Sequence, residues 1–175
     1  MNASIFWLTG LSGAGKTTVA SAVQKEFESN GQKLVLLDGD NLRDGLCKDL
    51  SFTIKDRREN IRRVAEVSKI FLNNNLSCIC TFISPTESIR DMAKAIIGPD
   101  NFHEIYVDTS LTICENRDIK GLYKKARKKE INNFTGIDSV YEPPLNPKLV
   151  LNCTDQPIQE SAKELVNYIT QQLNE

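Results

Sequence analysis

The segment from residue 8 to residue 18, LTGLSGAGKTT, holds the residue types best suited to chemistry. Residues 10 to 17 fit the spacing G-x-x-x-x-G-K-[ST], in which backbone N–H groups close around phosphate oxygens. The lysine of such a loop reaches the outer phosphates, and the hydroxyl after it faces Mg²⁺. We therefore expect Lys16 to be catalytic, Thr17 to bind the metal, and ATP to be bound by Gly10, Leu11, Ser12, Gly13, Ala14, Gly15, Lys16, Thr17 and Thr18.

A second candidate group is the sequence DGD at residues 38 to 40, directly after the apolar run LVLL. Open α/β sheets place ligand chemistry at the carboxyl ends of their strands. We expect Asp38 to act on Mg²⁺ through water, and Asp40 to accept or orient the proton of an attacking hydroxyl. Because D-G-D is also favourable turn chemistry, a purely structural turn is the alternative interpretation.

A phosphate-binding loop occurs in GTPase switches, motors and kinases alike. The guanine-reading tetrapeptide N-K-x-D occurs nowhere in the sequence, which argues against a GTPase switch. A motor, a nucleic-acid kinase and a small-molecule kinase remain. The length of 175 residues, that of one compact domain, favours the small-molecule kinase.

The chemistry-bearing residues need a sheet to position them, and short apolar runs rich in leucine or β-branched residues predict its strands. These runs span residues 4–9, 33–37, 76–83, 103–108 and 148–152. Helical periodicity occupies the segments between most of them, for instance after Asp56, and the C-terminal residues 158–173. The alternation predicts an α/β fold: a P-loop nucleoside triphosphate hydrolase-like three-layer sandwich with a mostly parallel five-stranded sheet, in one domain over residues 1–175.

The composition argues against several classes of protein. A hydrophobic fraction of 40%, a charged fraction of 26% and a formal net charge of -1 are ordinary for a globular protein and argue against nucleic-acid binding through overall charge. The stretch IFWL at residues 5–8 is too short for the core of a signal peptide, and no apolar run is long enough to span a bilayer. The five cysteines lack paired spacing and indicate buried free thiols. We therefore expect a cytoplasmic protein that binds small-molecule nucleotides.

Six motifs, in chain order, resemble those of the adenylylsulfate (APS) kinase family. They are GLSGAGKTT, LDGDNLRDGL, DLSFTIKDRRENIRR, FISP, KGLYKKAR and NFTGIDSVYEPP, and the resemblance runs from about Ile5 to Asn152. It implies an enzyme of sulfate assimilation that uses MgATP to phosphorylate the 3'-hydroxyl of APS, giving 3'-phosphoadenylylsulfate. It also implies a homodimer.

The resemblance further implies which residues contact the acceptor nucleotide. Arginine forks suit phosphate and sulfate oxygens, and a spacing of three puts Arg57 and Asn60 on one helical face. Phe52 and Phe134 are implied to stack on the acceptor base from opposite sides, although both could instead fill the core. The full set of implied acceptor contacts is Asp40, Arg43, Phe52, Arg57, Asn60, Lys120 and Phe134.

A basic stretch within residues 120 to 136 is expected to form a mobile lid that folds over the nucleotides and excludes water. An RNA-binding helix would have a similar sequence, but the overall charge makes that interpretation weaker. We interpret Arg58, Arg62 and Arg63 simply as a solvated basic face. The basic residues of the lid are Lys120, Lys124, Lys125, Arg127, Lys128 and Lys129.

Ser84 has two interpretations. The resemblance gives it a catalytic role, because the serine of the family's S-P motif is phosphorylated in some members. The segment Ser84-Pro85-Thr86-Glu87 also fits a helix start, with serine at the N-cap and glutamate at the third helical position. We expect Ser84 to cap this helix rather than to take part in catalysis.

Two departures from the family pattern concern the acceptor. Glu87 stands where many relatives have a basic residue, and it would repel an anionic acceptor if it faced the cleft. The loop begins at residue 10, so we expect no leader of the kind that many members carry. A kinase of a related nucleotidyl anhydride, such as cytidine diphosphoramidate in capsule modification, is therefore the alternative function. A non-catalytic ATP-binding subunit is a further alternative, against which the intact Asp40, Arg57 and Asn60 argue.

Overall fold

The computed structural model describes residues 3–174 and contains one parallel sheet. Its strand order is β2-β3-β1-β4-β5, and every neighbouring pair is parallel. Each of the apolar runs identified in the sequence overlaps one strand, so the predicted five-stranded α/β fold is confirmed. The strands are β1 (Ile5–Thr9), β2 (Val35–Asp38), β3 (Cys78–Thr81), β4 (Phe102–Asp108) and β5 (Leu149–Asn152).

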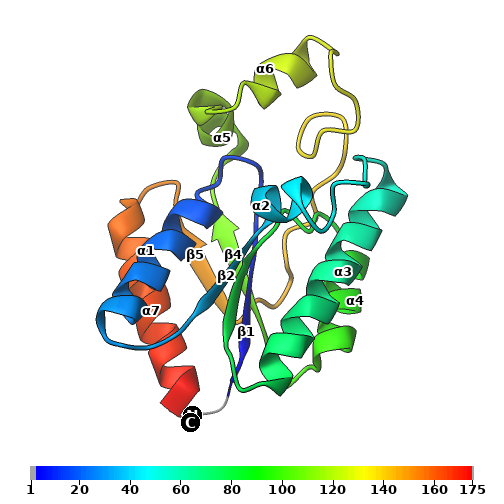
Figure 1. Ribbon diagram of the computed structural model, residues 1–175. Helices are drawn as coiled ribbons and strands as arrows, with labels where there is room; N and C mark the ends of the chain where they lie inside the picture. Colours follow the sequence, from blue (N-terminus) through cyan, green and yellow to red (C-terminus); the bar gives the residue numbers. More distant parts are fainter. Residues whose placement is uncertain (1–2, 175) are drawn as a thin grey trace.

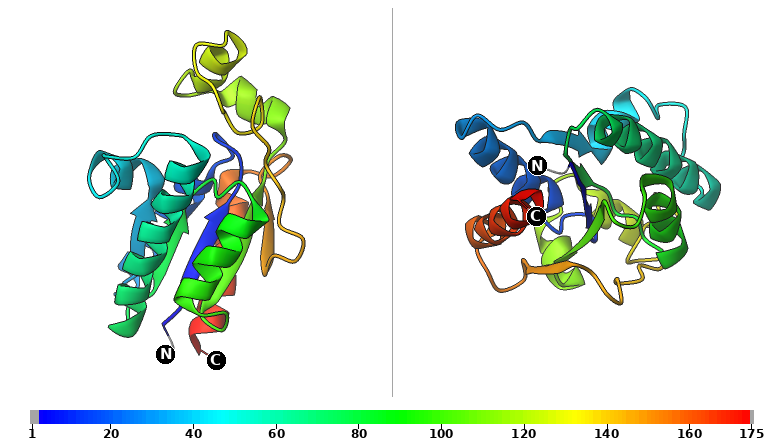
Figure 2. Two further views of the ribbon diagram at one scale, coloured as in Figure 1. Left: turned by 90° about the vertical axis from the view of Figure 1, so that its right-hand side faces the viewer. Right: turned by 90° about the horizontal axis from the view of Figure 1, so that it is seen from below.

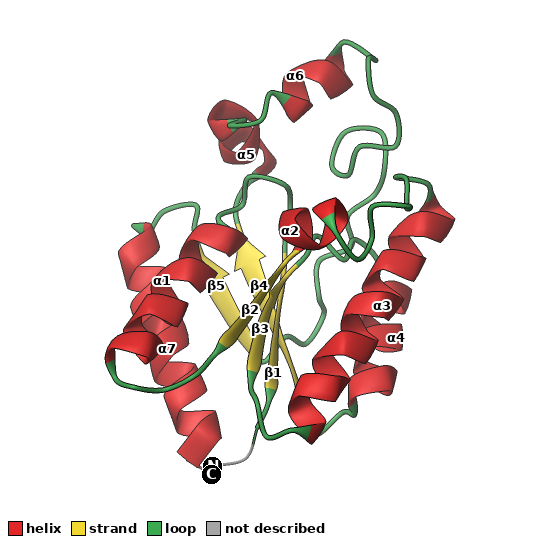
Figure 3. Cartoon of the chain, viewed as in Figure 1, coloured by secondary structure: helices red, strands yellow, loops and turns green. Residues whose placement is uncertain are grey.

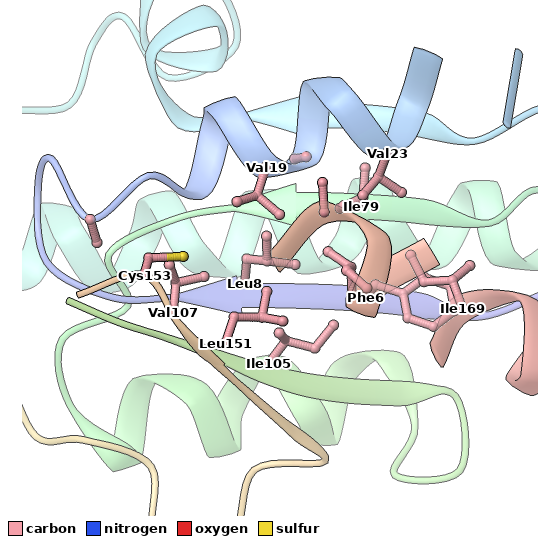
Figure 4. Packing of buried hydrophobic residues seen from close by; sticks show 14 of the residues in the cluster. Phe6, Leu8, Val19, Val23, Ile79, Ile105, Val107, Leu151, Cys153 and Ile169 are labelled. Atoms are coloured by element: carbon pink, nitrogen blue, oxygen red, sulfur yellow. The ribbon is translucent and has the colours of Figure 1, made fainter. Parts of the chain in front are cut away.

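Helices cover both faces of the sheet, which explains why its central strand is buried throughout and apolar from Ile5 to Leu8. Successive side chains of a strand point to opposite faces. Phe6 and Leu8 accordingly belong to the core under α1 (Lys16–Ser29) and α7 (Ile158–Asn174), shown in Figure 4. Ile5 and Trp7 belong to the core under α3 (Ile54–Asn73) and α4 (Glu87–Ile97). Figures 1 and 2 show these helix pairs as the two outer layers of the sandwich.

Three short helices lie over the carboxyl edge of the sheet. They are α2 (Gly39–Asp44), α5 (Leu111–Arg117) and α6 (Leu122–Arg127), and Figure 3 shows the loops that lead from α2 to α3 and from α6 back to β5. The P-loop, residues 10–17, follows the carboxyl end of β1 and lies at the same edge, as do most of the expected acceptor contacts.

The start of α4 differs from the sequence-based expectation. The helix begins at Glu87 with Thr86 as its N-cap, so Ser84 lies two residues too early to cap it and no capping box forms. The carboxylate of a residue distant in the sequence caps this helix end instead: Glu142 Oε2 accepts a 2.8 Å hydrogen bond from the backbone N–H of Glu87. The negative charge suits the positive end of the helix dipole. A contact between residues so far apart in the chain has no local sequence signature.

Two further expectations concern the environment of the chain. All five cysteines are free and buried, as predicted. Burial raises the pKa of the Cys80 thiol to about 12, and such a thiol is unreactive at neutral pH. Among the residues that the structure describes, no helix has both the length and the apolarity needed to cross a membrane.

Candidate functional site

The phosphate-binding loop connects the end of β1 with the first residue of α1. At Gly10 a Cβ would come within 2.6 Å of the Val107 carbonyl oxygen in β4, so the loop can leave the sheet there only at a glycine. Gly15 is the N-cap of α1, with a φ of 106° in the left-handed region. The turn thus points the N-terminus of α1 at the space above the sheet, which suits an anion.

Lys16 lies folded over the loop that precedes it. Its Nζ donates to the carbonyl oxygens of Gly10, at 2.9 Å, and Leu11, at 2.7 Å, and the residue is 8% exposed. Burial lowers the pKa of Lys16 from its ordinary 10.5 to about 8. A cation that is buried and bonded only to neutral carbonyls gains strongly from a phosphate placed beside it.

Thr17 and Asp38, the expected metal-side residues, are in direct contact. Thr17 Oγ1 donates to Asp38 Oδ2 at 2.8 Å, and Thr81 Oγ1 donates to the same oxygen at 2.8 Å. The other oxygen of Asp38 accepts from the backbone N–H groups of Asp40 and Asn41, so Asp38 is also the N-cap of α2. Burial acts to raise the pKa of Asp38, but these hydrogen bonds outweigh it and hold the pKa below its ordinary value. The carboxylate is therefore ionised at neutral pH.

Asp40 faces the lid. Its Oδ2 forms an ion pair with Lys120 Nζ, although the two residues lie 80 positions apart in the sequence. Both side chains are more than half exposed, so the pair lies at an open surface. The expected proton acceptor and the expected lid lysine are thus neighbours.

Three of the expected acceptor residues form one cluster. The Arg43 guanidinium lies 4.3 Å from the centroid of the Phe52 ring, and that of Arg57 lies 6.0 Å from it. Burial lowers the pKa of both arginines, and the charge of Arg43 lowers that of Arg57 further. Within residues 3–174, neither arginine has a carboxylate in ion-pair contact. Two partly desolvated cations beside a ring that is 60% exposed make this cluster attractive to an anionic aromatic ligand.

Arg57 also connects this cluster to the segment expected to form a lid. Its Nε donates to the Phe52 carbonyl oxygen at 3.0 Å. Its terminal nitrogens donate to Thr135 Oγ1, at 2.6 Å, and to the Asn133 carbonyl oxygen. Between those two residues, the Phe134 ring packs edge-on against Tyr123, with centroids 4.9 Å apart. Phe134 is partly buried in this position, and its stacking on an acceptor base stays a prediction.

Asn60 and Ser84 are more deeply placed. Asn60 is 5% exposed, and its Oδ1 is buried without a hydrogen-bond partner among the described residues. Ser84 is 2% exposed, has a φ of 43°, and accepts a 2.9 Å hydrogen bond from the Trp7 indole. The hydroxyl of Ser84 is therefore engaged in the core, whereas Asn60 has an acceptor atom that a ligand could satisfy.

Several residues of this region were missed at the sequence level. Tyr123 donates through its hydroxyl to the Ser12 carbonyl oxygen at 2.8 Å, which connects the lid to the P-loop. Arg117 donates to the carbonyl oxygens of Gly13 and Ala14. Side chains that bond backbone carbonyls leave no spacing pattern in the sequence. Thr81, which bonds Asp38, was also missed, and its only sequence signal is its position near the end of a predicted strand.

The comparisons with known proteins agree with one another. The sequence profile described as adenylylsulphate kinase matches residues 2–152. The adenylyl-sulfate kinase of Shewanella amazonensis is 49% identical over 166 residues, covering 95% of this chain and 84% of that protein. That of Oceanobacillus iheyensis is 51% identical, covering 95% and 83%.

Among solved structures, that of the Mycobacterium tuberculosis APS kinase in complex with AMPPNP and APS superposes with a TM-score of 0.92 at 42% identity, covering 97% of this chain and 98% of that one. The profile and the curated relatives extend across nearly the whole chain. The chain therefore belongs to the adenylylsulfate kinase family.

Proposed function

We propose that this protein transfers the γ-phosphate of ATP to the 3'-hydroxyl of adenylylsulfate, giving 3'-phosphoadenylylsulfate and ADP. The observation that carries the proposal is a closed ring of contacts. Thr17 of the P-loop bonds Asp38, which caps the helix that holds Arg43. From Arg43 the ring passes through Phe52 and Arg57 to the lid segment at residues 133–135. It returns to the P-loop through Tyr123 and the Ser12 carbonyl. The P-loop and the expected acceptor residues therefore belong to one contact network, which supports the binding of two anionic nucleotides beside each other.

Phosphoryl transfer depends mostly on positioning and charge neutralisation. In the proposed reaction the bond between the β-bridging oxygen and the γ-phosphorus breaks, and a bond from the acceptor 3'-oxygen to that phosphorus forms. The proton of the hydroxyl passes to the Asp40 carboxylate. Lys16 and Lys120 supply positive charge, and the lid excludes water. Arg43, Arg57 and Phe52 hold the acceptor.

We also propose that Thr17 and Asp38 hold Mg²⁺ together with the ATP phosphates. The support is their oxygen chemistry: a hydroxyl and an ionised carboxylate in direct contact. Magnesium commonly takes one or two protein oxygens plus substrate phosphates and water. The described residues contain no cluster of three or more histidine, cysteine or acidic side chains that could hold a metal without such phosphates. When bound, the ion neutralises charge on the transferred group.

The test measures ADP release with purified protein, MgATP and either adenylylsulfate or cytidine diphosphoramidate. We expect release that depends on adenylylsulfate, and a much higher kcat/KM for it than for the cytidine compound. The Lys16→Ala variant should lose kcat, while Phe52→Ala should mainly raise the KM for the acceptor, with both variants folded. Preference for the cytidine compound, or release independent of any acceptor, would refute the proposed substrate.

We further propose a single catalytic domain over residues 1–175 with a lid at about 120–136, working as a homodimer in the cytoplasm. Five buried free thiols support a reducing compartment. The family resemblance supports the dimer. Light scattering of the purified chain tests the oligomeric state, and one cooperative calorimetric transition is expected for one domain.

A further inference from the structure

The segment of residues 45–53, which we call the Phe52 loop, joins α2 to α3 and presents the exposed Phe52 ring. Its second half is held by Arg43 and Asp56. Arg43 donates to the carbonyl oxygens of Leu50 and Ser51, and Asp56 accepts from the backbone N–H of Ser51. The backbone N–H of the buried Cys47 donates to the Leu42 carbonyl oxygen at 2.8 Å. The first half of the loop also has a side-chain anchor.

That anchor is Arg63, one turn further along α3 than Glu59. Its guanidinium forms a fork on Asp49, with Nη1 to Oδ1 at 2.6 Å and Nη2 to Oδ2 at 2.8 Å. Nη1 also donates to the Leu46 carbonyl oxygen at 2.9 Å. Nε donates to Glu59 Oε1 at 3.0 Å, which fixes the orientation of the fork on the helix. Arg63 is still partly exposed, as the sequence-based interpretation expected, but its guanidinium also bonds this loop and Glu59.

The neighbouring Arg62 provides a comparison within the same helix. It pairs with Glu59, at 2.8 Å, and with Glu66, at 3.6 Å, and both partners belong to α3. Arg62 and Arg63 thus carry the same charge and both pair with Glu59, but both ion pairs of Arg62 are with residues of α3. An effect that appears when Arg63 is replaced, but not when Arg62 is replaced, must therefore come from the lost contacts with the Phe52 loop.

We propose that Arg63 is a positioning residue for the acceptor: it holds the first half of the Phe52 loop through Asp49 and Leu46, so that Phe52 is already placed when the acceptor binds. The proposal rests on the proposed function, because Phe52 must contact the acceptor. Without Arg63 the loop would have to be ordered at the moment of binding, which costs affinity. The effect should therefore appear in the acceptor KM and leave ATP binding unchanged.

The kinetic test compares Arg63→Met with the matched control Arg62→Met. We expect Arg63→Met to raise the acceptor KM about tenfold, with kcat and the KM for ATP within about twofold of wild type. Arg62→Met should leave all three constants within about twofold. Arg63→Lys keeps the charge but not the fork, so it should fall between wild type and Arg63→Met. Equal effects of Arg63→Met and Arg62→Met, or an equal rise in both KM values, would overturn the proposal.

A second variant approaches the same contact from the loop. Asp49→Asn removes the charge that the fork binds, and its side chain is 57% exposed, so the core is not disturbed. We expect it to raise the acceptor KM in the same direction. The double variant with Arg63→Met should be no worse than Arg63→Met alone, because both changes break one interaction. Additive effects would mean that the two residues act separately and would count against the proposal.

Trypsin cleavage after the exposed Lys48 gives a readout that needs no turnover. We expect Arg63→Met to accelerate this cleavage, followed by mass spectrometry, while Arg62→Met leaves it at the wild-type rate. Unchanged cleavage at Lys48 in Arg63→Met would show that Arg63 does not hold the loop. If the wild-type protein does not phosphorylate adenylylsulfate, the proposed function fails. The comparison of trypsin cleavage rates in Arg63→Met and Arg62→Met still decides whether Arg63 holds the loop.

Discussion

The pKa of Lys16 leads to a quantitative prediction about ATP binding. Burial against neutral carbonyls lowers this pKa to about 8. A bound polyphosphate places negative charge beside the ammonium group and raises the pKa again. A group with a higher pKa in the complex than in the free protein takes up a proton on binding. The affinity for ATP should therefore fall as the pH rises through about 8.

The size of the effect follows from the two pKa values. We take about 8 for the free protein and the ordinary 10.5 as a lower limit for the complex. The dissociation constant then rises about 20-fold between about pH 7.5 and 9.5, and about 0.9 proton is taken up at about pH 9. A terminal phosphate has its second pKa near 6, so ATP itself contributes almost nothing in this range.

Isothermal titration calorimetry of ATP against the wild-type protein, in two buffers of different ionisation enthalpy, measures both quantities. The control is Lys16→Met, which should bind ATP more weakly and with no change in affinity over the same pH range. A wild-type affinity that stays constant up to about pH 9.5 would refute the lowered pKa. If the affinity of Lys16→Met for ATP still falls as the pH rises, a group other than Lys16 is titrating.

Three further variants test single contacts. Thr17→Ala should raise the Mg²⁺ concentration for half-maximal activity by about tenfold, while Thr17→Ser, which keeps the hydroxyl beside Asp38, should not; identical Mg²⁺ titrations would contradict this. Glu142→Ala should lower the free energy of unfolding in urea by about 1 kcal/mol, because the backbone N–H of Glu87 loses its capping carboxylate. Glu142→Gln keeps an acceptor oxygen but not the charge, so it should lose a similar amount, and wild-type stability of Glu142→Gln would contradict a charge effect. Arg90→Met should cost about 3 kcal/mol, because Glu104, which it contacts at 2.7 Å, loses its cation. Arg90→Met/Glu104→Met should recover most of that loss, and a double variant as unstable as the single one would show that packing decides.

The fold was predictable because its signals are local. Each strand lies in a short run rich in apolar residues, and β1 is apolar at successive positions because helices cover both faces of the sheet. The P-loop could be placed because its spacing follows from the geometry of a turn around phosphate. The prediction failed at α4, where a favourable local capping sequence lost to the contact from Glu142, 55 residues away. Propensity rules do not include such partners.

The roles of single side chains were predictable only in part. Asp38 was expected to act on a metal or to form a turn, and the structure shows it capping α2 while it also bonds Thr17. One carboxylate with two oxygens satisfies both the helix and the P-loop, so the two interpretations were never exclusive. Arg63 and Arg62 are identical in type and adjacent in sequence, and only the path of the Phe52 loop distinguishes them. That path depends on contacts across the fold.

If Arg57 binds the acceptor as proposed, its contacts connect acceptor binding to the geometry of the proposed lid. Its donors are used on Phe52, Asn133 and Thr135, so an anionic acceptor must share the guanidinium with the lid or displace it. Either event changes the free energy of the lid's position, and the lid also contacts the P-loop through Tyr123 and Ser12. Coupling of this kind is reciprocal, so whatever the acceptor does to the affinity for ATP, ATP must do equally to the affinity for the acceptor. The two nucleotides should therefore bind interdependently, through Arg57.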